Sequence, residues 1–185
     1  MFIQTEETPN PASLKFIPDG EIILTNGNVE FKNQKQAAIK SPLALQLFEI
    51  AGVESIFLGR DFITVTKSDK FEWSKIKAEI LATIMDFLVS GKPVMFDEIS
   101  ENFANSEDSE IVKQIKELIE IKVRPAVAMD GGDIIFHSFE DGIVKLQLKG
   151  SCSGCPSSTI TLKSGIENML KHYIPEVESV EQVED

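Results

Sequence analysis

A break in the apolar pattern between residues 92 and 109 constrains the fold of this 185-residue chain more than any other feature of its sequence. The stretch is acidic, contains several Ser and Asn, and shows no sustained apolar period. On either side of it, residues 1–91 and 110–185 carry regular apolar patterns and have the length of a small domain. The sequence therefore predicts two small domains joined by an acidic linker at 92–109, with a short helical piece around 96–103.

Both predicted domains mix strands with helices, which indicates the α+β fold class. In the first domain, alternation and turn signals predict strands at 2–5, 13–17, 53–58 and 62–66, and helical spacing predicts helices at 42–50 and 73–87. In the second domain, the same signals predict a helix at 111–122 kinked near Pro125, a hairpin of 134–139 and 143–148 turning at Asp141-Gly142, a helix at 156–173 and a strand at 177–183. The second domain thus has the order α-β-β-α-β.

Composition excludes several kinds of protein. An apolar content of 42% and a charged content of 26% are typical of a soluble globular chain, and no apolar run approaches the roughly 18 residues of a membrane span. The formal net charge of −12, without a cluster of Lys and Arg, argues against nucleic acid as a partner. Because the first residues show neither a basic n-region nor an Arg-rich transit signal, we expect a cytoplasmic protein, or an organellar one whose presequence has been removed.

The two cysteines, Cys152 and Cys155, stand where the predicted hairpin ends and the next helix begins. Two intervening residues allow both sulfurs to face one ion, Gly154 permits the close turn, and Pro156 suits the first turn of a helix. Backbone N–H groups and the positive end of the helix dipole favour the thiolate, the form that binds soft metals and iron–sulfur clusters. The pair is therefore predicted to serve chemistry or a metal, because a bridge closing so short a loop stabilises little.

Three uses of this pair are open on the residues alone. A dithiol–disulfide oxidoreductase is one, although its motif usually follows the first strands of a βαβ unit. A structural zinc site needs four ligands, and the other candidates are His137, predicted mid-strand, and His172, on the order of 25 Å away along the helix at ~1.5 Å per residue. The third use is a cluster that bridges two chains, because a two-fold axis turns two thiolates into the four that a [4Fe–4S] or [2Fe–2S] centre takes.

The segment Asp130-Gly131-Gly132-Asp133 is predicted to be structural. Paired glycines supply a positive φ readily, so they suit the reversal from helix to strand, and the aspartates would cap or orient that reversal. A valine at Gly132 is then expected to cost about 1–3 kcal/mol of stability through strain in φ.

Several of these segments resemble the NifU C-terminal domain over about residues 110–183. The matching residues are Val123-Arg124-Pro125-Ala126, Asp130-Gly131-Gly132-Asp133, and the longer run Gly150, Cys152, Cys155-Pro156, Ser158, Thr161-Leu162-Lys163 and Gly165-Ile166-Glu167. The first half is similar to the N-terminal domain of Nfu-type scaffold proteins at Thr8-Pro9-Asn10-Pro11, Lys15-Phe16 and residues 61–67. Together the two resemblances span nearly the whole chain.

The resemblance implies an iron–sulfur scaffold or carrier, not an enzyme, that binds one [4Fe–4S] cluster per homodimer between its two subunits. Cys152 and Cys155 match the two cysteines of the family, while a dithiol–disulfide oxidoreductase stays the alternative. The implied partners are recipient apo iron–sulfur proteins and upstream cluster assembly proteins. The lack of a presequence favours a bacterial cytoplasm over the mitochondrial matrix. Since residues 1–91 hold neither Cys nor His, we expect that domain to fold independently and to bind no cluster.

Overall fold

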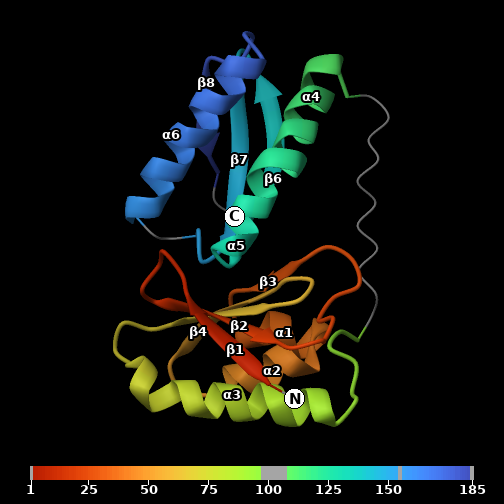
Figure 1. The fold of residues 1–185 in the computed structure, drawn as a ribbon, viewed down its shortest axis with the longest axis vertical. Coiled ribbons are helices and arrows are strands. Elements are labelled where there is room, and N and C mark those ends of the chain that lie inside the picture. Colours follow the sequence, from red (N-terminus) through yellow and green to blue (C-terminus); the bar gives the residue numbers. More distant parts are fainter. Residues whose placement is uncertain (1, 97–107, 154–155, 184–185) are drawn as a thin grey trace. The chain divides into compact units, whose positions relative to one another are not determined.

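The computed structural model describes residues 2–96, 108–153 and 156–183, and the chain divides into two units, Met1–Glu101 and Asn102–Asp185. Each unit combines helices with one sheet (Figure 1), which confirms the α+β class. Most of the predicted acidic linker, residues 97–107, lies outside the described residues, and so does most of its expected helical piece. Within the described ranges, no helix is both long and apolar enough to cross a membrane.

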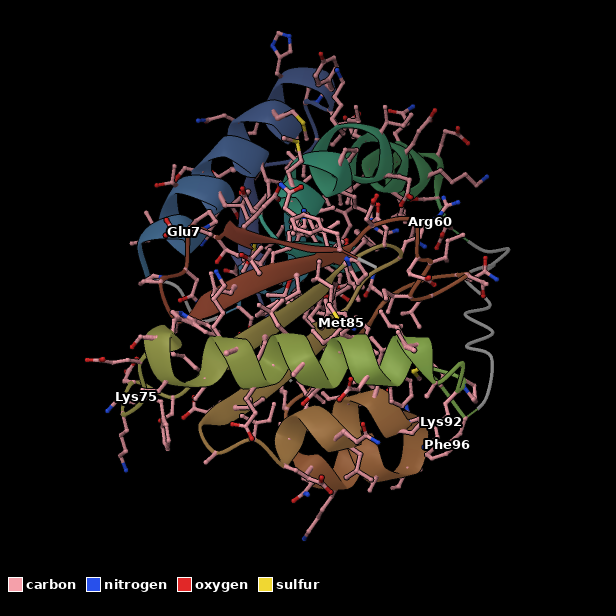
Figure 2. The ribbon with its side chains drawn as sticks, turned by 60° about the horizontal axis from the view of Figure 1, so that its bottom comes forward. Glu7, Arg60, Lys75, Met85, Lys92 and Phe96 are labelled. Carbon is pink, nitrogen blue, oxygen red and sulfur yellow. The ribbon has the colours of Figure 1, made fainter. Side chains whose placement is uncertain are left out.

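Unit 1 is built on a five-stranded antiparallel sheet of order β1-β2-β5-β4-β3. Its strands are β1 Ile3–Glu7, β2 Ser13–Pro18, β3 Val29–Phe31, β4 Val53–Leu58 and β5 Ile63–Lys67, and its helices are α1 Gln34–Lys40, α2 Pro42–Phe48 and α3 Trp73–Val89. The three helices gather on one side of the sheet (Figure 1), and α3 comes to the front in Figure 2, where Lys75 marks its beginning. Apolar side chains of the strands and helices form one buried core between them.

The elements with strong apolar periods lie where the sequence predicts them. Helix α2 begins with Pro42 at its first turn, and the Ser41 hydroxyl caps it by accepting the Ala44 N–H at 3.1 Å. Helix α3 buries Ile76, Ile80, Ile84 and Phe87, the spacing expected of one helical face. Trp73 is half-buried and packs against the same core.

Two short elements, β3 and α1, were not predicted. Strand β3 has three residues and α1 has seven, of which Ala37 alone is fully buried. Such an element has no apolar period to detect, because a single buried alanine cannot define a helical face. Helix α1 is specified instead by its cap, since the Asn33 side chain accepts the Gln36 N–H at 3.0 Å.

Unit 1 includes residues 94–96, which lie beyond Gly91, the predicted end of the first domain. The buried Ser41 hydroxyl donates to the Val94 carbonyl at 2.7 Å, and the Phe96 N–H donates to the Lys40 carbonyl at 2.9 Å. Val94 and Met95 also pack on the core of the unit. This segment therefore contributes to the stability of unit 1.

Unit 2 has a three-stranded sheet of order β6-β7-β8, in which β6 and β7 are antiparallel and β7 and β8 are parallel. Its elements are α4 Glu110–Leu118, the π-helical turn η1 Ile119–Val123, α5 Arg124–Met129, β6 Gly132–Glu140, β7 Ile143–Gly150, α6 Pro156–Tyr173 and β8 Ser179–Gln182. Every second residue of β7 is buried, so the helices cover one face of the sheet. The predicted order α-β-β-α-β is confirmed.

The kink predicted near Pro125 is the π-helical turn η1, which ends two residues before it. Proline has no N–H and its ring crowds the preceding turn, so an α-helix cannot continue through it unchanged. The turn widens instead, and the helix resumes at Arg124 as α5. The expected hairpin turn is also present, because Asp141 and Gly142 have φ of 50° and 78°, the positive pair of a type I′ turn.

The edge strand β8 is fastened to α6 by Glu167. Its carboxylate accepts the Val180 N–H at 3.0 Å and the Lys171 ammonium at 2.8 Å. The hydrogen bond from Lys171, followed by that from Val180, lowers the pKa of Glu167 below its ordinary value of 4.5. The negative charge of Glu167 therefore contributes to holding β8 in place.

We predict that a fragment of residues 1–101 unfolds cooperatively on its own and binds no iron. A fragment ending at Gly91 should be less stable by about 1–3 kcal/mol, because the buried Ser41 hydroxyl loses its acceptor and the core loses two apolar side chains. Urea unfolding followed by the fluorescence of Trp73, the single tryptophan, measures both fragments. Equal stability of the two fragments would count against a role for residues 94–96.

We further predict that Glu167→Gln lowers the stability of the chain at neutral pH and that the difference disappears in acid. Because the pKa of Glu167 is lower in the folded chain, its contribution is present above the ordinary value of 4.5 and is lost as the pH falls below it. Urea unfolding of unit 2 at several pH values measures this change. Glu117→Gln, at an exposed position of α4, is the control, and a difference that persists in acid would contradict the assignment.

Candidate functional site

The loop that carries Cys152 is tied to the turn that precedes β6. Gly150 ends β7 with a φ of 68°, a conformation that glycine adopts readily, and the chain turns there. The Ser151 N–H then donates to the Gly131 carbonyl at 3.3 Å, and the Ser151 hydroxyl donates to the Asp130 carbonyl. Two segments about 20 residues apart in the sequence are thus held side by side.

The Cys152 side chain lies inside this junction and not at its surface. Cys152 is 4% exposed and belongs to the apolar core of unit 2. A Cβ atom on Gly132 would lie 2.8 Å from the Cys152 Sγ and 2.6 Å from the Lys149 carbonyl oxygen, closer than atoms can pack. The Ser151 hydroxyl is 3.9 Å from the same sulfur. We call this space, bounded by Gly132, the Lys149 carbonyl and Ser151, the thiol seat.

The reason for the paired glycines differs from the prediction at one of the two positions. Gly131 has a φ of 77° and makes the helix-to-strand reversal, as expected. Gly132 does not have a positive φ, so strain in φ is the wrong explanation for it. Glycine is required there because the Cys152 sulfur and the Lys149 carbonyl occupy the space that a side chain would need.

Cys155, the second candidate ligand, lies outside the described residues. Helix α6 begins at Pro156, one residue later, as the sequence predicts. That both thiols act as ligands, and that the start of this helix favours their thiolates, stay predictions.

An ion pair lies beside the thiol seat, and it was not predicted from the sequence. Arg124 donates to Asp133 through two nitrogens, Nε to Oδ1 at 2.9 Å and Nη2 to Oδ2 at 2.8 Å, and its Nη1 donates to Glu120 at 2.7 Å. Asp133 is 4% exposed and immediately follows Gly132. The hydrogen bond to Asp133 raises the pKa of the Arg124 guanidinium, burial opposes this, and Glu120 adds to it. An arginine directly before Pro125 and an aspartate directly after the glycine pair were the available signals.

The two histidines are exposed, and each lies on a different element from Cys152. His137 is exposed on β6, between two residues where the pairing with β7 shifts register. His172 is exposed near the far end of α6 and packs edge-on against Tyr173, with ring centroids 5.0 Å apart. In the part of the chain that the structure describes, no three His, Cys, Asp or Glu side chains gather as a metal site.

We predict that Gly132→Ala destabilises unit 2 by about 1–3 kcal/mol, because the new methyl group must displace either the Cys152 sulfur or the Lys149 carbonyl. Gly165→Ala is the matched control, since nothing lies within 4 Å of its added carbon in α6, and it should stabilise by about 0.5–1 kcal/mol. Urea unfolding followed by circular dichroism measures both variants. A loss of stability at Gly165 equal to that at Gly132 would show that the thiol seat is not responsible.

Two family models match the chain, one for each unit. Residues 3–91 match the model described as "Scaffold protein Nfu/NifU N terminal", and residues 115–181 match the "NifU-like domain". The first match covers the five-stranded sheet and its helices, and the second covers the thiol seat and the Arg124–Asp133 pair.

Two named relatives are similar to this chain over its whole length. A human protein named "NFU1 iron-sulfur cluster scaffold homolog, mitochondrial" is 57% identical over 187 residues, covering 100% of this chain and 73% of its own length. The protein of the same name from Drosophila willistoni is 52% identical over 189 residues, covering 100% of this chain and 64% of its own. The chain therefore spans about two thirds to three quarters of the length of these relatives.

Among solved structures, the solution structure of a NifU-like protein from Saccharomyces cerevisiae is 34% identical, with a TM-score of 0.48, and covers 53% of this chain and 87% of its own. The family assignment depends instead on the two domain matches and on the 57% identity to the human protein, which extends over the whole of this chain. Taken with the glycine-lined thiol seat at the motif, they establish that this chain belongs to the Nfu/NifU family of scaffold proteins.

Proposed function

We propose that this chain carries an iron–sulfur cluster as its cargo, held by Cys152 and Cys155 and shared between two copies of the chain. The observation that carries the proposal is the thiol seat, in which Cys152 is placed by backbone contacts from two strands. It is supported by the relatives, which are named iron-sulfur cluster scaffold homologues.

The number of available ligands favours two copies. The chain holds two cysteines, and a [4Fe–4S] centre takes about four thiolates. His137 and His172 lie on exposed surfaces of β6 and α6, away from the junction that holds Cys152. A second chain related by a two-fold axis supplies the missing pair of thiolates. We therefore propose one [4Fe–4S] cluster per homodimer.

The site suits a carrier better than an enzyme. The attacking thiol of an oxidoreductase must be exposed, and Cys152, which is buried in the core of unit 2, does not suit that role. The relatives are named as scaffold proteins and not as oxidoreductases. A cluster held by two ligands from each chain can be released when the two chains separate, which is what transfer to an apo-protein requires.

The partners and compartment follow from the cargo. We propose that apo iron–sulfur proteins receive the cluster and that cluster assembly proteins supply it. The bacterial cytoplasm and the mitochondrial matrix are both reducing enough to keep two thiols free, and the relatives are named mitochondrial. Unit 1 contains no Cys or His and contributes no ligand to the cluster.

Anaerobic reconstitution with iron and sulfide, with iron, sulfide and molecular mass measured on one sample, tests this function. We expect about four irons per two chains and a shift from monomer toward dimer, because the cluster's binding energy becomes association energy. Cys152→Ala and Cys155→Ala should each abolish the cluster, while His137→Ala, the control, should retain it.

Two outcomes would overturn the proposal. Four irons on a single isolated chain would remove the need for a second copy. A Cys152–Cys155 disulfide that turns over thiol substrates would favour the oxidoreductase.

A further inference from the structure

We infer that Arg124 is a positioning residue for the Cys152 thiol, and that it acts through its ion pair with Asp133. The inference deepens the proposed function, because it identifies what holds the proposed cluster ligand in place. The placement of the thiol itself can be tested without any cluster.

The Arg124–Asp133 pair has a fixed geometry. Arg124 and Asp133 form a two-pronged contact, with Nε–Oδ1 and Nη2–Oδ2 distances of 2.9 and 2.8 Å. A planar guanidinium facing a carboxylate in this way fixes both the distance and the angle between the two groups. The Asp133 side chain is 6% exposed, so water does not compete strongly for the carboxylate. The pair therefore joins the beginning of α5 rigidly to the beginning of β6.

The backbone at the beginning of β6 connects the ion pair to the Cys152 sulfur. Asp133 and Gly132 are the first two residues after the turn, and they pair with Lys149 and Gly150 of β7. At Gly132 the backbone approaches the Cys152 Sγ so closely that one carbon atom does not fit between them. A shift of Gly132 by a few tenths of an ångström therefore moves the backbone atoms that pack against the Cys152 sulfur. The orientation of the Arg124–Asp133 pair is transmitted to the thiol through this contact.

The two carboxylate partners of Arg124 differ in their exposure to solvent. Glu120 receives a hydrogen bond of 2.7 Å, but its side chain is 64% exposed and it lies on the same helical segment as Arg124. An exposed pair between neighbouring turns fixes little beyond the helix itself. The Asp133 pair differs because it joins two elements across the turn and its carboxylate is 6% exposed. Glu120→Gln therefore provides a matched control.

The experiment measures the alkylation of Cys152 by iodoacetamide in the full-length, cluster-free chain carrying Cys155→Ser, so that one thiol reacts. We expect Arg124→Lys, which keeps the charge but loses the two-pronged contact, to raise the alkylation rate about tenfold. Asp133→Asn keeps the size of the side chain but loses its charge, and it should act in the same direction. Glu120→Gln should leave the rate unchanged.

The dependence of these rates on urea separates positioning from general destabilisation. A locally displaced thiol reacts at a rate that changes little with urea, whereas alkylation through global unfolding rises steeply with it. A shallow dependence in Arg124→Lys or Asp133→Asn supports the inference. A steep dependence in both variants, or rates equal to that of Glu120→Gln, would overturn it.

A second arm uses the chain with both cysteines and measures iron content and cluster loss to a chelator after anaerobic reconstitution. Arg124→Lys and Asp133→Asn should lose the cluster severalfold faster than the unmodified chain and Glu120→Gln. If the unmodified chain takes up no cluster while the alkylation result stands, the proposed function fails and the positioning of the thiol is retained. If every chain loads and holds the cluster equally, Arg124 does not position the ligand.

Discussion

The contact between the Cys152 sulfur and the backbone of Gly132 is the constraint on which the rest of unit 2 depends. It requires a residue without a side chain at the start of β6, a close turn after Gly150, and a polar link between the two loops. That link is Ser151, which bonds to the carbonyls of Asp130 and Gly131. Gly132, Gly150 and Cys152 all belong to the motif segments by which the sequence resembles its family.

The two units use their cores differently. Unit 1 surrounds its buried side chains with five antiparallel strands and three helices, and no Cys or His occurs in its sequence. Unit 2 has three strands and includes the Cys152 thiol among its buried side chains. A reactive group inside a small core is kept from solvent by the same packing that stabilises the domain. The stability of unit 2 and the placement of its thiol are therefore coupled.

Elements in which apolar side chains recur at a regular spacing could be predicted from the sequence. Features that depend on contacts between distant segments could not. Helices α3 and α6 and the β6–β7 hairpin have apolar periods or turn residues that can be read directly. The pairing of Arg124 with Asp133 could not be read in this way, since nothing in a charged residue's type indicates its partner across a turn. The role of Gly132 was misjudged for a similar reason: close approach of a sulfur from another loop leaves no local signal.

His137, the exposed histidine of β6, lies where the pairing of β6 with β7 shifts by one residue. Pairing between β6 and β7 shifts between Phe136 and Ser138, so His137 is an extra residue with no partner opposite it in the ladder. If His137 were instead paired within the ladder, counting back from the hairpin turn would bring Asp133 rather than Gly132 opposite Gly150. An aspartate Cβ would then stand where the sulfur now rests, and the side chains of the first half of the strand would exchange faces. His137 thus takes up one residue outside the ladder, so that Gly132, and not the aspartate that follows it, lies opposite Gly150.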